Sequence, residues 1–365
     1  MKIVFLVPKL NVSSGVAKVI STKANYILKN PENEVILVSQ NNGNSTLFFG
    51  LDKRVKLVDF TLKGNFYIFF KSYKRQVNSL ILKEKPDILV LADNGLKAFL
   101  FPIIIPVAIP LVLEIHCSKY VSEKENTSFK DLLWRFIELN IRNFGIKKFK
   151  NVVLLSKNSQ KEWNLPTSKV IPNPVDQRSI SNDLHSKKII CVTRNAFEKG
   201  IDRLFPIWSQ LEANNPDWTL EIFCDIKGYY DLQFLLDKYK LKNCIIKAPC
   251  KTLETEYESS SIFVCTSRFE AFPLVVLEAL SFGIPIVAFD CPIGMNTILS
   301  NDFGFLIENG NQEAFVSKLE ILMQDFDLRT QMGRLAKLES EKYLPEKILK
   351  KYENYLLEVV SKDKR

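Results

Sequence analysis

The chain has 365 residues, of which 46% are hydrophobic and 25% charged, and its formal net charge is +9. These proportions exclude a disordered or low-complexity chain, and the length exceeds the usual size of a single core, so we expect two domains. Residues 1–170 hold 26 Lys and Arg against 13 Asp and Glu, whereas the remainder holds 24 against 28. The basic first half indicates an anionic partner, such as a phospholipid surface, a pyrophosphate-linked acceptor or nucleic acid. The alternative is a solvated basic surface.

The seven cysteines form no C-x-x-C pair, and several lie in apolar runs. This distribution favours a reducing compartment over a disulfide framework or a zinc site. The first eight residues lead directly into a predicted strand, so no signal peptide is expected. The most apolar stretch, Phe99–Ile115, contains three prolines and is shorter than a membrane span, which predicts a helix end, a turn and a buried strand.

The first half alternates strands with helices from its start. Lys2–Val7 predicts a buried strand, Asn11–Gly15 a loop and Val16–Lys29 a helix. Further apolar runs predict strands at Glu34–Ser39, Val55–Phe60, Ile88–Ala92, Val107–Ile115 and Val152–Ser156. Strands that alternate with helices indicate parallel βαβ units and a doubly wound sheet.

A polar, proline-containing stretch at Pro172–His185 predicts a linker, after which the alternation restarts. Strands are expected at Lys188–Thr193, Thr219–Cys224, Cys244–Lys247, Ile262–Thr266 and Pro285–Phe289, and a long helical tail at Gln312–Glu358. We therefore predict an α/β protein of two Rossmann-like lobes, residues 1–172 and 173–345, with a final helix over 346–365 that packs back on the first lobe. A ligand is expected in the cleft at the carboxyl ends of the strands.

The segment from Ser267 to Glu278 carries the most chemical information. A buried strand precedes it, a loop holds Glu270, and a helix that starts near Pro273 holds Glu278. Free amides at the start of such a helix favour anions, so a diphosphate is expected on the amides near Phe272 and Leu274. The two carboxylates then lie where they accept hydrogen bonds from sugar or ribose hydroxyls.

The alternative for both glutamates is ordinary solvation. For Glu278 the neighbouring residues argue against it, because Val275, Val276, Leu277, Ala279 and Leu280 make its helix apolar on nearly every face. A carboxylate in that setting needs a partner.

The spacing Glu270-x7-Glu278, followed by Ala-Leu-Ser-Phe-Gly-Ile-Pro-Ile-Val-Ala, resembles the donor signature of glycosyltransferase family 4, which are retaining enzymes of the GT-B fold. Val170–Asp176 is similar to the inter-lobe motif of that family, and Arg194–Leu204 to its phosphate-binding loop. The resemblance implies that Glu270 contacts the donor sugar near the reacting centre and Glu278 the ribose. It also implies that Arg194 and Lys199 contact the diphosphate.

The sequence departs from the family pattern at several positions. Thr193 and Ala271 stand where the family usually has Gly, and Cys291–Ile298 lacks an acidic residue often found there. None of these changes removes a charged donor contact, although they alter the space for the sugar. In the first lobe the loop Ser13-Ser14-Gly15 has one of the usual two glycines, and Gly15 gives its backbone room to approach a phosphate or sugar.

The chain has two histidines. His116 follows the predicted strand Val107–Ile115, at an end where it is able to donate to the sugar or orient the acceptor, a role that the resemblance favours over a structural one. His185 lies in the linker and is expected to be solvated.

No metal or other cofactor is expected. The sole Asp-x-Asp, Asp325–Asp327, falls in a helical surface stretch and is interpreted as solvated. Two fixed cations, Arg194 and Lys199, are instead able to stabilise a leaving nucleoside diphosphate.

The run Asp131–Lys150 has apolar residues at helical spacing and a basic end. Its aromatic residues are expected to face the core. The alternative is that this run, with Lys71, Lys74 and Arg75, contacts an anionic leaflet.

The sequence thus predicts a cytoplasmic glycosyltransferase that moves a sugar, with retention, from a UDP- or GDP-sugar to a saccharide or lipid-linked saccharide acceptor. Bacterial surface polysaccharide or lipopolysaccharide synthesis is the expected setting, with peripheral attachment to the inner face of the membrane as an option. The alternatives are a nucleotide-sugar epimerase or hydrolase on the same fold, and a non-catalytic nucleotide-sugar binder. The acidic second half argues against nucleic acid as a partner.

Overall fold

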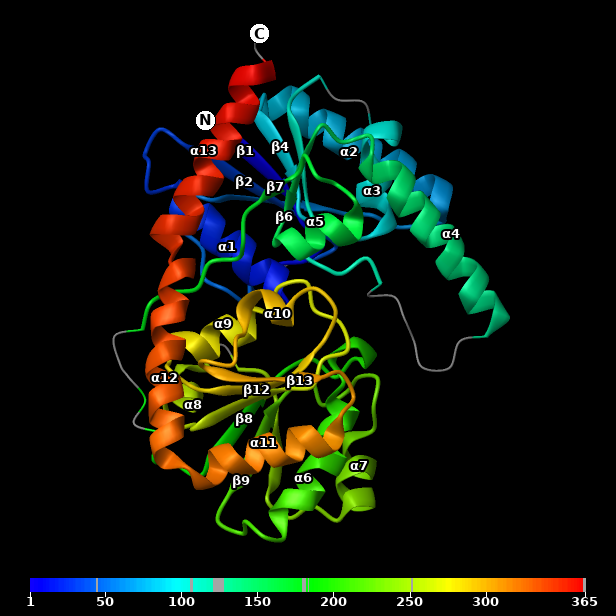
Figure 1. Cartoon of the computed structure of the whole chain (residues 1–365). Coiled ribbons are helices and arrows are strands. Elements are labelled where there is room, and N and C mark those ends of the chain that lie inside the picture. The colour runs from blue at the N-terminus through cyan, green and yellow to red at the C-terminus, as the bar shows by residue number, and fades with distance from the viewer. Residues whose placement is uncertain are drawn as a thin grey trace. The chain divides into compact units, whose positions relative to one another are not determined.

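The computed structural model describes residues 1–43, 45–105, 108–120, 128–178, 182, 184–250 and 252–363. The chain divides into two compact units. The first holds Met1–Lys119, the segment that ends at Pro172, and Pro345–Arg365; the second is built mainly from Asn173–Leu344. Each unit contains one parallel sheet with helices on both faces (Figure 1), which confirms the predicted class of two Rossmann-like lobes.

The first sheet has the strand order β3-β2-β1-β4-β5-β6-β7, and every pairing is parallel. Its central strands are apolar on both faces because helices cover both. The strands are β1 (Lys2–Leu6), β2 (Glu34–Gln40), β3 (Lys56–Phe60), β4 (Ile88–Leu91), β5 (Leu111–Glu114), β6 (Asn151–Leu154) and β7 (Lys169–Val170). The helices are α1 (Gly15–Ile27), α2 (Phe66–Glu84), α3 (Leu96–Ile104), α4 (Phe129–Ile146), α5 (Lys157–Trp163) and α13 (Pro345–Asp363).

Two apolar clusters hold these helices to the first sheet. One joins α1 and α13 to one face, and in it Ile348, Tyr352 and Leu356 of α13 pack with Ile20 and Ala24 of α1. The other joins α2, α3, α5 and the end of α4 to the opposite face. The last helix of the chain is therefore part of the core of the first unit, beside α1 (Figure 1).

The second sheet has the order β10-β9-β8-β11-β12-β13, also parallel throughout. Its helices α6, α7 and α11 lie on one face and α8 and α9 on the other (Figure 1). The strands are β8 (Lys188–Val192), β9 (Thr219–Phe223), β10 (Cys244–Lys247), β11 (Ile262–Cys265), β12 (Ile286–Asp290) and β13 (Gly304–Glu308). The α-helices are α6 (Leu204–Glu212), α7 (Leu232–Tyr239), α8 (Glu254–Glu258), α9 (Leu274–Ser281), α10 (Met295–Ile298), α11 (Gln312–Gln324) and α12 (Phe326–Ser340).

The sequence-based strands are confirmed with small shifts of their ends, but two strands were not predicted. These are the short β7 and the edge strand β13. The strand expected at Val107–Ile115 begins at Leu111, and residues 106 and 107 lie outside the described part, as do residues 179–181 and 183 of the predicted linker. The expected helical tail is divided between α11, α12 and α13. Among the described residues, no helix combines the length and apolar character needed to cross a bilayer.

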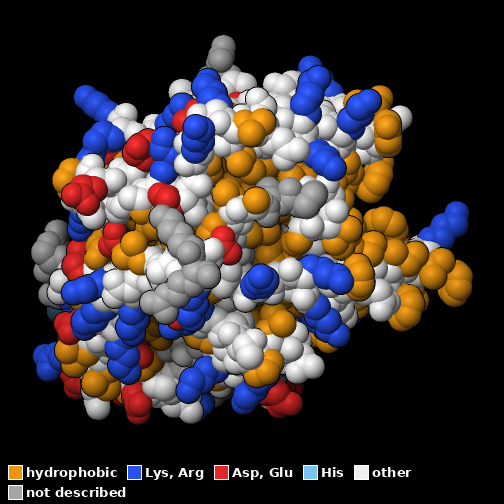
Figure 2. Space-filling view, turned by 90° about the horizontal axis from the view of Figure 1, so that it is seen from above, with side chains coloured by type: hydrophobic (Ala, Val, Ile, Leu, Met, Phe, Trp, Pro, Cys, Tyr) orange, Lys and Arg blue, Asp and Glu red, His pale blue; other side chains and the backbone are white. Residues whose placement is uncertain are grey.

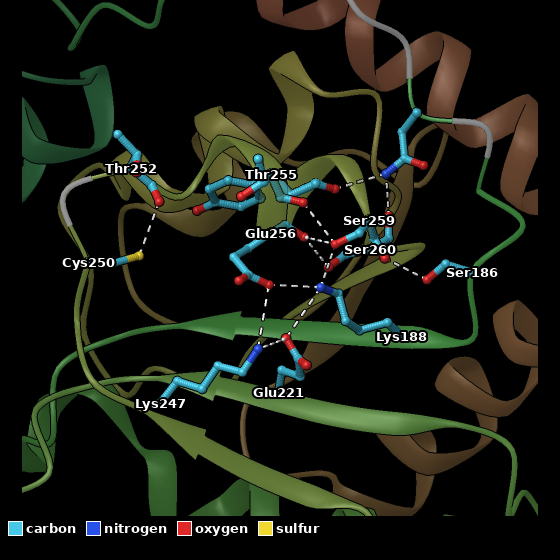
Figure 3. Close-up of polar contacts among 12 residues, drawn as sticks. Ser186, Lys188, Glu221, Lys247, Cys250, Thr252, Thr255, Glu256, Ser259 and Ser260 are labelled. Atoms are coloured by element: carbon cyan, nitrogen blue, oxygen red, sulfur yellow. Dashed lines mark hydrogen bonds and ion pairs between the residues drawn. The ribbon is translucent and has the colours of Figure 1, made fainter.

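A network of four charged side chains ties three strands of the second sheet to α8 (Figure 3). Lys188 Nζ lies 3.3 Å from Glu221 Oε2 and 3.0 Å from Glu256 Oε2. Lys247 Nζ lies 3.0 Å from Glu221 Oε2 and 3.7 Å from Glu256 Oε2. Burial acts to raise the pKa of Glu256, but the two lysines hold this pKa below its usual value. Charges that alternate around the network stabilise one another, so it acts as a fixed structural connection.

Candidate active site

The loop after β8 is held against the end of β11 by a glycine. Gly200 has φ +59°, and a Cβ on it would lie 2.2 Å from the carbonyl oxygen of Thr266, so only glycine fits there. The hydroxyl of Thr266 donates to the carbonyl of Gly200 at 2.9 Å. These contacts place Lys199, the residue before the glycine, at the carboxyl ends of two adjacent parallel strands.

Lys199 and Glu270 meet at this edge of the sheet. Lys199 Nζ lies 2.7 Å from Glu270 Oε1, and the Ser267 hydroxyl donates to the same oxygen at 2.8 Å. The Glu270 side chain is 8% exposed and that of Lys199 is 20% exposed. The structure thus brings together two residues that are 71 positions apart and that the sequence placed in one site.

The backbone around Glu270 is fixed by the loop after β12. Glu270 forms a parallel bridge with Ile293. A Cβ on Gly294 would lie 2.5 Å from the carbonyl oxygen of Glu270, so a larger residue would displace the loop. Burial raises the pKa of the nearby Cys265 and Cys291 thiols, and the Glu270 charge raises both further. Neutral thiols therefore line this side of the carboxylate.

Glu278 has the partner that its apolar helix requires. It lies on α9 and is buried, and the hydroxyl of Tyr257 on α8 donates to its Oε2 at 3.1 Å. The Tyr257 ring stacks on Phe282, with centroids 5.2 Å apart. Burial raises the pKa of Tyr257 well above its usual value, and Glu278 raises it further, so the phenol keeps the proton that it donates. Sequence reasoning missed Tyr257, because nothing in the spacing joins it to Glu278.

Arg194 does not share the contacts of Lys199. Its side chain is half exposed, and its Nη2 lies 2.7 Å from Glu198 Oε1. Both cations that the sequence assigned to a diphosphate are therefore paired with carboxylates: Arg194 with Glu198, and Lys199 with Glu270.

Arg268 is a second residue that sequence reasoning missed. Its guanidinium makes two 2.7 Å hydrogen bonds to the carboxylate of Asp202, donates to the carbonyl of Phe197 at 3.0 Å and stacks over the Phe197 ring. Burial acts to raise the pKa of Asp202, but the bonds from Arg268 and Tyr230 hold it below its usual value. Arg268 thus fixes the loop that carries Lys199. Its position directly after Ser267, within the segment that the sequence marks as the donor site, is the feature from which this role could have been predicted.

The start of α9 presents backbone amides. Leu274 is its first residue and Pro273 its N-cap, which offers no side-chain acceptor. Phe272 is buried, packs edge-on against Tyr343, and accepts a hydrogen bond on its carbonyl from the Asn173 side chain at 3.5 Å. The inter-lobe motif thereby supports the loop between Glu270 and α9.

In the first unit, the other predicted site residues lie at the carboxyl edge of the sheet. Gly15 is exposed at the start of α1, where the Ser14 side chain caps the helix by accepting from Ala17 N at 3.2 Å. His116 follows β5. Its backbone N–H donates to the Asn94 side chain at 3.1 Å, and its ring Nε2 lies 3.0 Å from Glu114 Oε2. β1 and β5 both pair with β4, so the two residues share one edge.

The remaining predictions have mixed outcomes. His185 is exposed and stacks on Phe326. Asp325 caps α12 by accepting from Leu328 N at 2.8 Å, and Asp327 is exposed in the first turn of that helix. Within the described ranges, no group of three or more His, Cys, Asp or Glu side chains has an arrangement able to hold a metal ion.

The prediction that the aromatic residues of α4 face the core is wrong. Trp134, Phe136 and Phe144 are 58%, 66% and 56% exposed, whereas Phe149, which follows the helix, is buried. Only the end of the helix packs: a Cβ on Gly145 would lie 2.3 Å from the backbone oxygen of Phe99, so the glycine lets α4 touch α3 there. The earlier turns extend beyond that contact, and hydrophobic side chains with Lys and Arg gather on that side of the molecule (Figure 2).

Comparisons with known proteins agree with this architecture. Residues 174–339 match the family model described as glycosyl transferases group 1. The chain is similar to an uncharacterized glycosyltransferase of Haemophilus influenzae (27% identical, over 97% of this chain and 99% of the relative). It is also similar to the amylovoran biosynthesis glycosyltransferase AmsD of Erwinia amylovora (26% identical, over 97% and 99%). The crystal structure of Anabaena HepE in complex with UDP and glucose has a TM-score of 0.73 at 17% identity, over 98% and 99% of the two chains.

Two parallel-sheet lobes of this topology are the GT-B fold, and the solved structures that resemble the chain are GT-B glycosyltransferases. The chain is accordingly a glycosyltransferase, an enzyme of the hexosyltransferase type. More particularly, residues 174–339 are similar to the glycosyl transferases group 1 model, and a relative that matches along nearly its whole length is named for amylovoran biosynthesis.

Proposed function

We propose that this glycosyltransferase is a retaining enzyme of family 4 that transfers a sugar from a UDP- or GDP-sugar to a saccharide acceptor. The observation that carries the proposal is the 2.7 Å contact between Lys199 and Glu270, beside the uncapped start of α9. A cation, a carboxylate and free helix amides at the carboxyl ends of parallel strands suit an anionic sugar donor. The HepE structure, which holds UDP and glucose, supports a nucleotide-sugar donor.

In this proposal, the donor replaces the carboxylate partners in two ion pairs of the second unit, Lys199–Glu270 and Arg194–Glu198. Its diphosphate takes the place of the carboxylates beside Lys199 and Arg194 and accepts from the amides near Phe272 and Leu274. Negative charge grows on the diphosphate as the glycosidic bond breaks, so both cations stabilise the transition state more than the ground state. This is the role that a metal plays in other transferases, and we propose that the reaction proceeds without one.

The two glutamates then have different partners. Glu270, released from Lys199, accepts from hydroxyls of the donor sugar. Glu278 keeps its bond from Tyr257 on Oε2 and accepts from the ribose with its other oxygen. Gly15 and His116 of the first unit contribute contacts to the transferred sugar and the acceptor.

We further propose that the acceptor is lipid-linked and that the enzyme works at the inner, anionic face of the cell membrane, in the synthesis of a bacterial surface polysaccharide. The observation for this is the apolar and basic surface of α2 and α4. Phe66, Tyr67 and Ile68 of α2 are exposed and precede Lys71, Lys74 and Arg75 on the same helix. Aromatic side chains at the headgroup level together with basic residues are typical of interfacial helices, and each cation contributes about 1 kcal/mol near an anionic leaflet.

The central test is a thermal-shift panel of nucleoside diphosphates and their sugars on the wild type and on Glu278→Ala. UDP or GDP at 100 times its Kd stabilises the wild type by about 2.7 kcal/mol, and the variant loses that response. If no nucleotide raises the Tm of the wild type, the donor proposal is wrong. NMR of the product gives the anomeric configuration. Turnover of donor at the full rate without acceptor would instead indicate a hydrolase or epimerase, and binding without turnover a silent binder.

The membrane proposal is tested by cosedimentation with phosphatidylglycerol vesicles. The wild type is expected to bind at low salt and to lose binding as salt rises, because the cationic contribution is screened. Trp134→Ala with Phe136→Ala should weaken binding, whereas Phe234→Ala, which removes an aromatic ring of similar exposure from the second unit, should not. The proposal is contradicted if wild type and both variants bind the vesicles equally. It is also contradicted if the wild type forms a dimer that Trp134→Ala with Phe136→Ala abolishes.

A further inference from the structure

A sealed charged cluster lies behind His116 at the end of β5. Lys23 of α1 places its Nζ 2.8 Å from Glu114 Oε2, with side chains that are 3% and 1% exposed. His116 Nε2 lies 3.0 Å from the same oxygen, and the His116 side chain is 4% exposed. Tyr352 of α13 covers the pair, with its ring centroid 4.0 Å from Lys23 Nζ. Three elements therefore enclose one carboxylate between a lysine and a histidine.

The proton positions in this cluster follow from the charge on Glu114. Burial acts to raise the pKa of Glu114, but the charge of Lys23 and the hydrogen bond from His116 hold it at about 2. An ionised carboxylate only accepts hydrogen bonds, so His116 Nε2 must carry a proton. The ring is then either the neutral Nε2–H tautomer or the imidazolium ion.

Charge balance selects the neutral ring. Lys23 already compensates Glu114, and an imidazolium would leave a second positive charge buried without a counter-ion, which is costly. Among the residues that the structure describes, Tyr352 and Tyr355 of α13 also interact with Glu114. Burial raises the pKa of Tyr352 well above its usual value and that of Tyr355 to about 12, so neither supplies an anion.

We propose that Glu114 is a positioning residue that holds His116 as the neutral Nε2–H tautomer, and that Lys23 keeps the ring neutral by compensating Glu114. Nδ1 is thereby left as a hydrogen-bond acceptor, while the Asn94 side chain fixes the backbone beneath the ring. A His116 with this tautomer accepts a hydrogen bond from a hydroxyl of the sugar or the acceptor. This last step rests on the proposed function; the tautomer does not.

The tautomer is directly observable, because the chain has only two histidines, His116 and His185. Protein labelled with ¹⁵N-histidine is examined by long-range ¹H–¹⁵N NMR, and His185→Gln assigns the signals. The expected spectrum at neutral pH shows a protonated Nε2 and an unprotonated Nδ1 for His116. An Nδ1–H tautomer, or an imidazolium at neutral pH, overturns the proposal. Because this spectrum is recorded on the wild type, the result does not depend on whether a variant folds.

Substitution of the lysine tests the second half. Lys23→Met leaves Glu114 uncompensated, so His116 should take up the missing charge, and its titration midpoint should rise by about one to three pH units. Lys23→Arg keeps the charge and should leave the midpoint within the wild-type range. This variant also keeps the proposal testable if Lys23→Met does not fold. Lys29→Met is the matched control, because Lys29 pairs with Glu346 of α13 in solvent. A midpoint that is the same in Lys23→Met and wild type refutes the role of Lys23.

Transfer kinetics connect the tautomer to function. Glu114→Gln should mix the two tautomers and lower kcat/KM about tenfold or more, as loss of a histidine-orienting carboxylate does elsewhere. Stabilisation by the nucleotide, which binds the second unit, should stay unchanged. Mixed tautomers with undiminished transfer overturn the role of Nδ1. An inactive wild type with the expected tautomer counts against the proposed function alone.

Discussion

Two of the lysine–glutamate pairs in the molecule have nearly equal lengths but lie in very different surroundings. Lys23–Glu114 in the first unit spans 2.8 Å and is sealed from water, whereas Lys199–Glu270 in the second spans 2.7 Å with a lysine that is one-fifth exposed. A sealed pair has no route to another partner, so it fixes geometry and charge. A pair at the open end of a sheet is able to exchange its carboxylate for the phosphate of a ligand. Exposure, rather than distance, therefore separates a structural ion pair from a candidate binding pair.

The largest expected effect comes from breaking the sealed pair. Glu114→Ala leaves Lys23 buried without a counter-charge, and we expect the free energy of unfolding to fall by about 3–5 kcal/mol. The double variant Lys23→Met with Glu114→Leu should recover much of this loss, since it removes both charges. Urea unfolding of wild type, Glu114→Ala, Lys23→Met, Glu114→Leu and the double variant measures the differences. Additive losses in the double variant would mean that the two side chains do not interact.

The open pair should respond in activity instead. Lys199→Ala removes a cation that is proposed to act on the leaving diphosphate, and we expect kcat to fall about 10²–10³-fold, the loss typical for one transition-state charge contact. Its stability should change little, because the lysine is partly exposed. Lys187→Ala, at an exposed pair with Asp217, is the control for loss of a surface charge. A stability loss as large as that of Glu114→Ala would remove the distinction between the two pairs.

The two pairs also differ in whether the sequence predicts them. The strands, the class of fold and the segment Ser267–Glu278 could be predicted because apolar periodicity and local spacing determine them. The sequence marks Glu278 as a carboxylate in an apolar helix, and Lys23 is likewise a charged residue among apolar neighbours in α1: Val19, Ile20, Ala24 and Ile27. Its partner lies 91 positions away, so only the folded sheet reveals it.

Other features of the structure could not be predicted from neighbouring residues in the sequence. The aromatic residues of α4 have the spacing of a core-facing helix, yet all of them are exposed, because α4 packs only near its end, where Gly145 meets Phe99. The pairing of Arg194 with Glu198, and the clamp of Arg268 on Asp202, depend on loop conformations that spacing does not determine. Long-range contacts and loop geometry are thus the part of the site that the sequence left open.

Acid should act on the sealed pair through Glu114. The pKa of this group in the folded protein is held at about 2, below the value of an unfolded glutamate, about 4.3. Its contribution to stability is therefore fully present above the unfolded pKa and is lost as the pH falls from there towards 2. Urea midpoints measured down this range should fall more steeply for wild type than for Lys23→Met with Glu114→Leu. Parallel curves would contradict an ionised Glu114.

A smaller effect is expected at the partner of Glu278. Tyr257→Phe removes one hydrogen bond to a buried carboxylate, at a cost of about 1 kcal/mol. Because the same carboxylate is proposed to bind ribose, the variant should also show a smaller thermal shift with nucleotide than wild type. Tyr239→Phe, a partly buried tyrosine of the same unit, should change neither value. A normal nucleotide response in Tyr257→Phe would restrict Tyr257 to a structural role.

The smallest effect belongs to the network of Lys188, Glu221, Lys247 and Glu256, which combines features of both pairs (Figure 3). Its lysines contact two carboxylates each and are 15% and 35% exposed, so it is neither sealed nor open. We expect Lys188→Met to lower stability by about 1 kcal/mol or less in low salt, and the difference from wild type to shrink at high salt as screening weakens the network. Lys187→Met, one residue earlier, should have no measurable effect because both side chains of its pair are more than half exposed. If the loss in Lys188→Met is independent of salt, the apolar stem of the lysine rather than its charge holds the strands to α8.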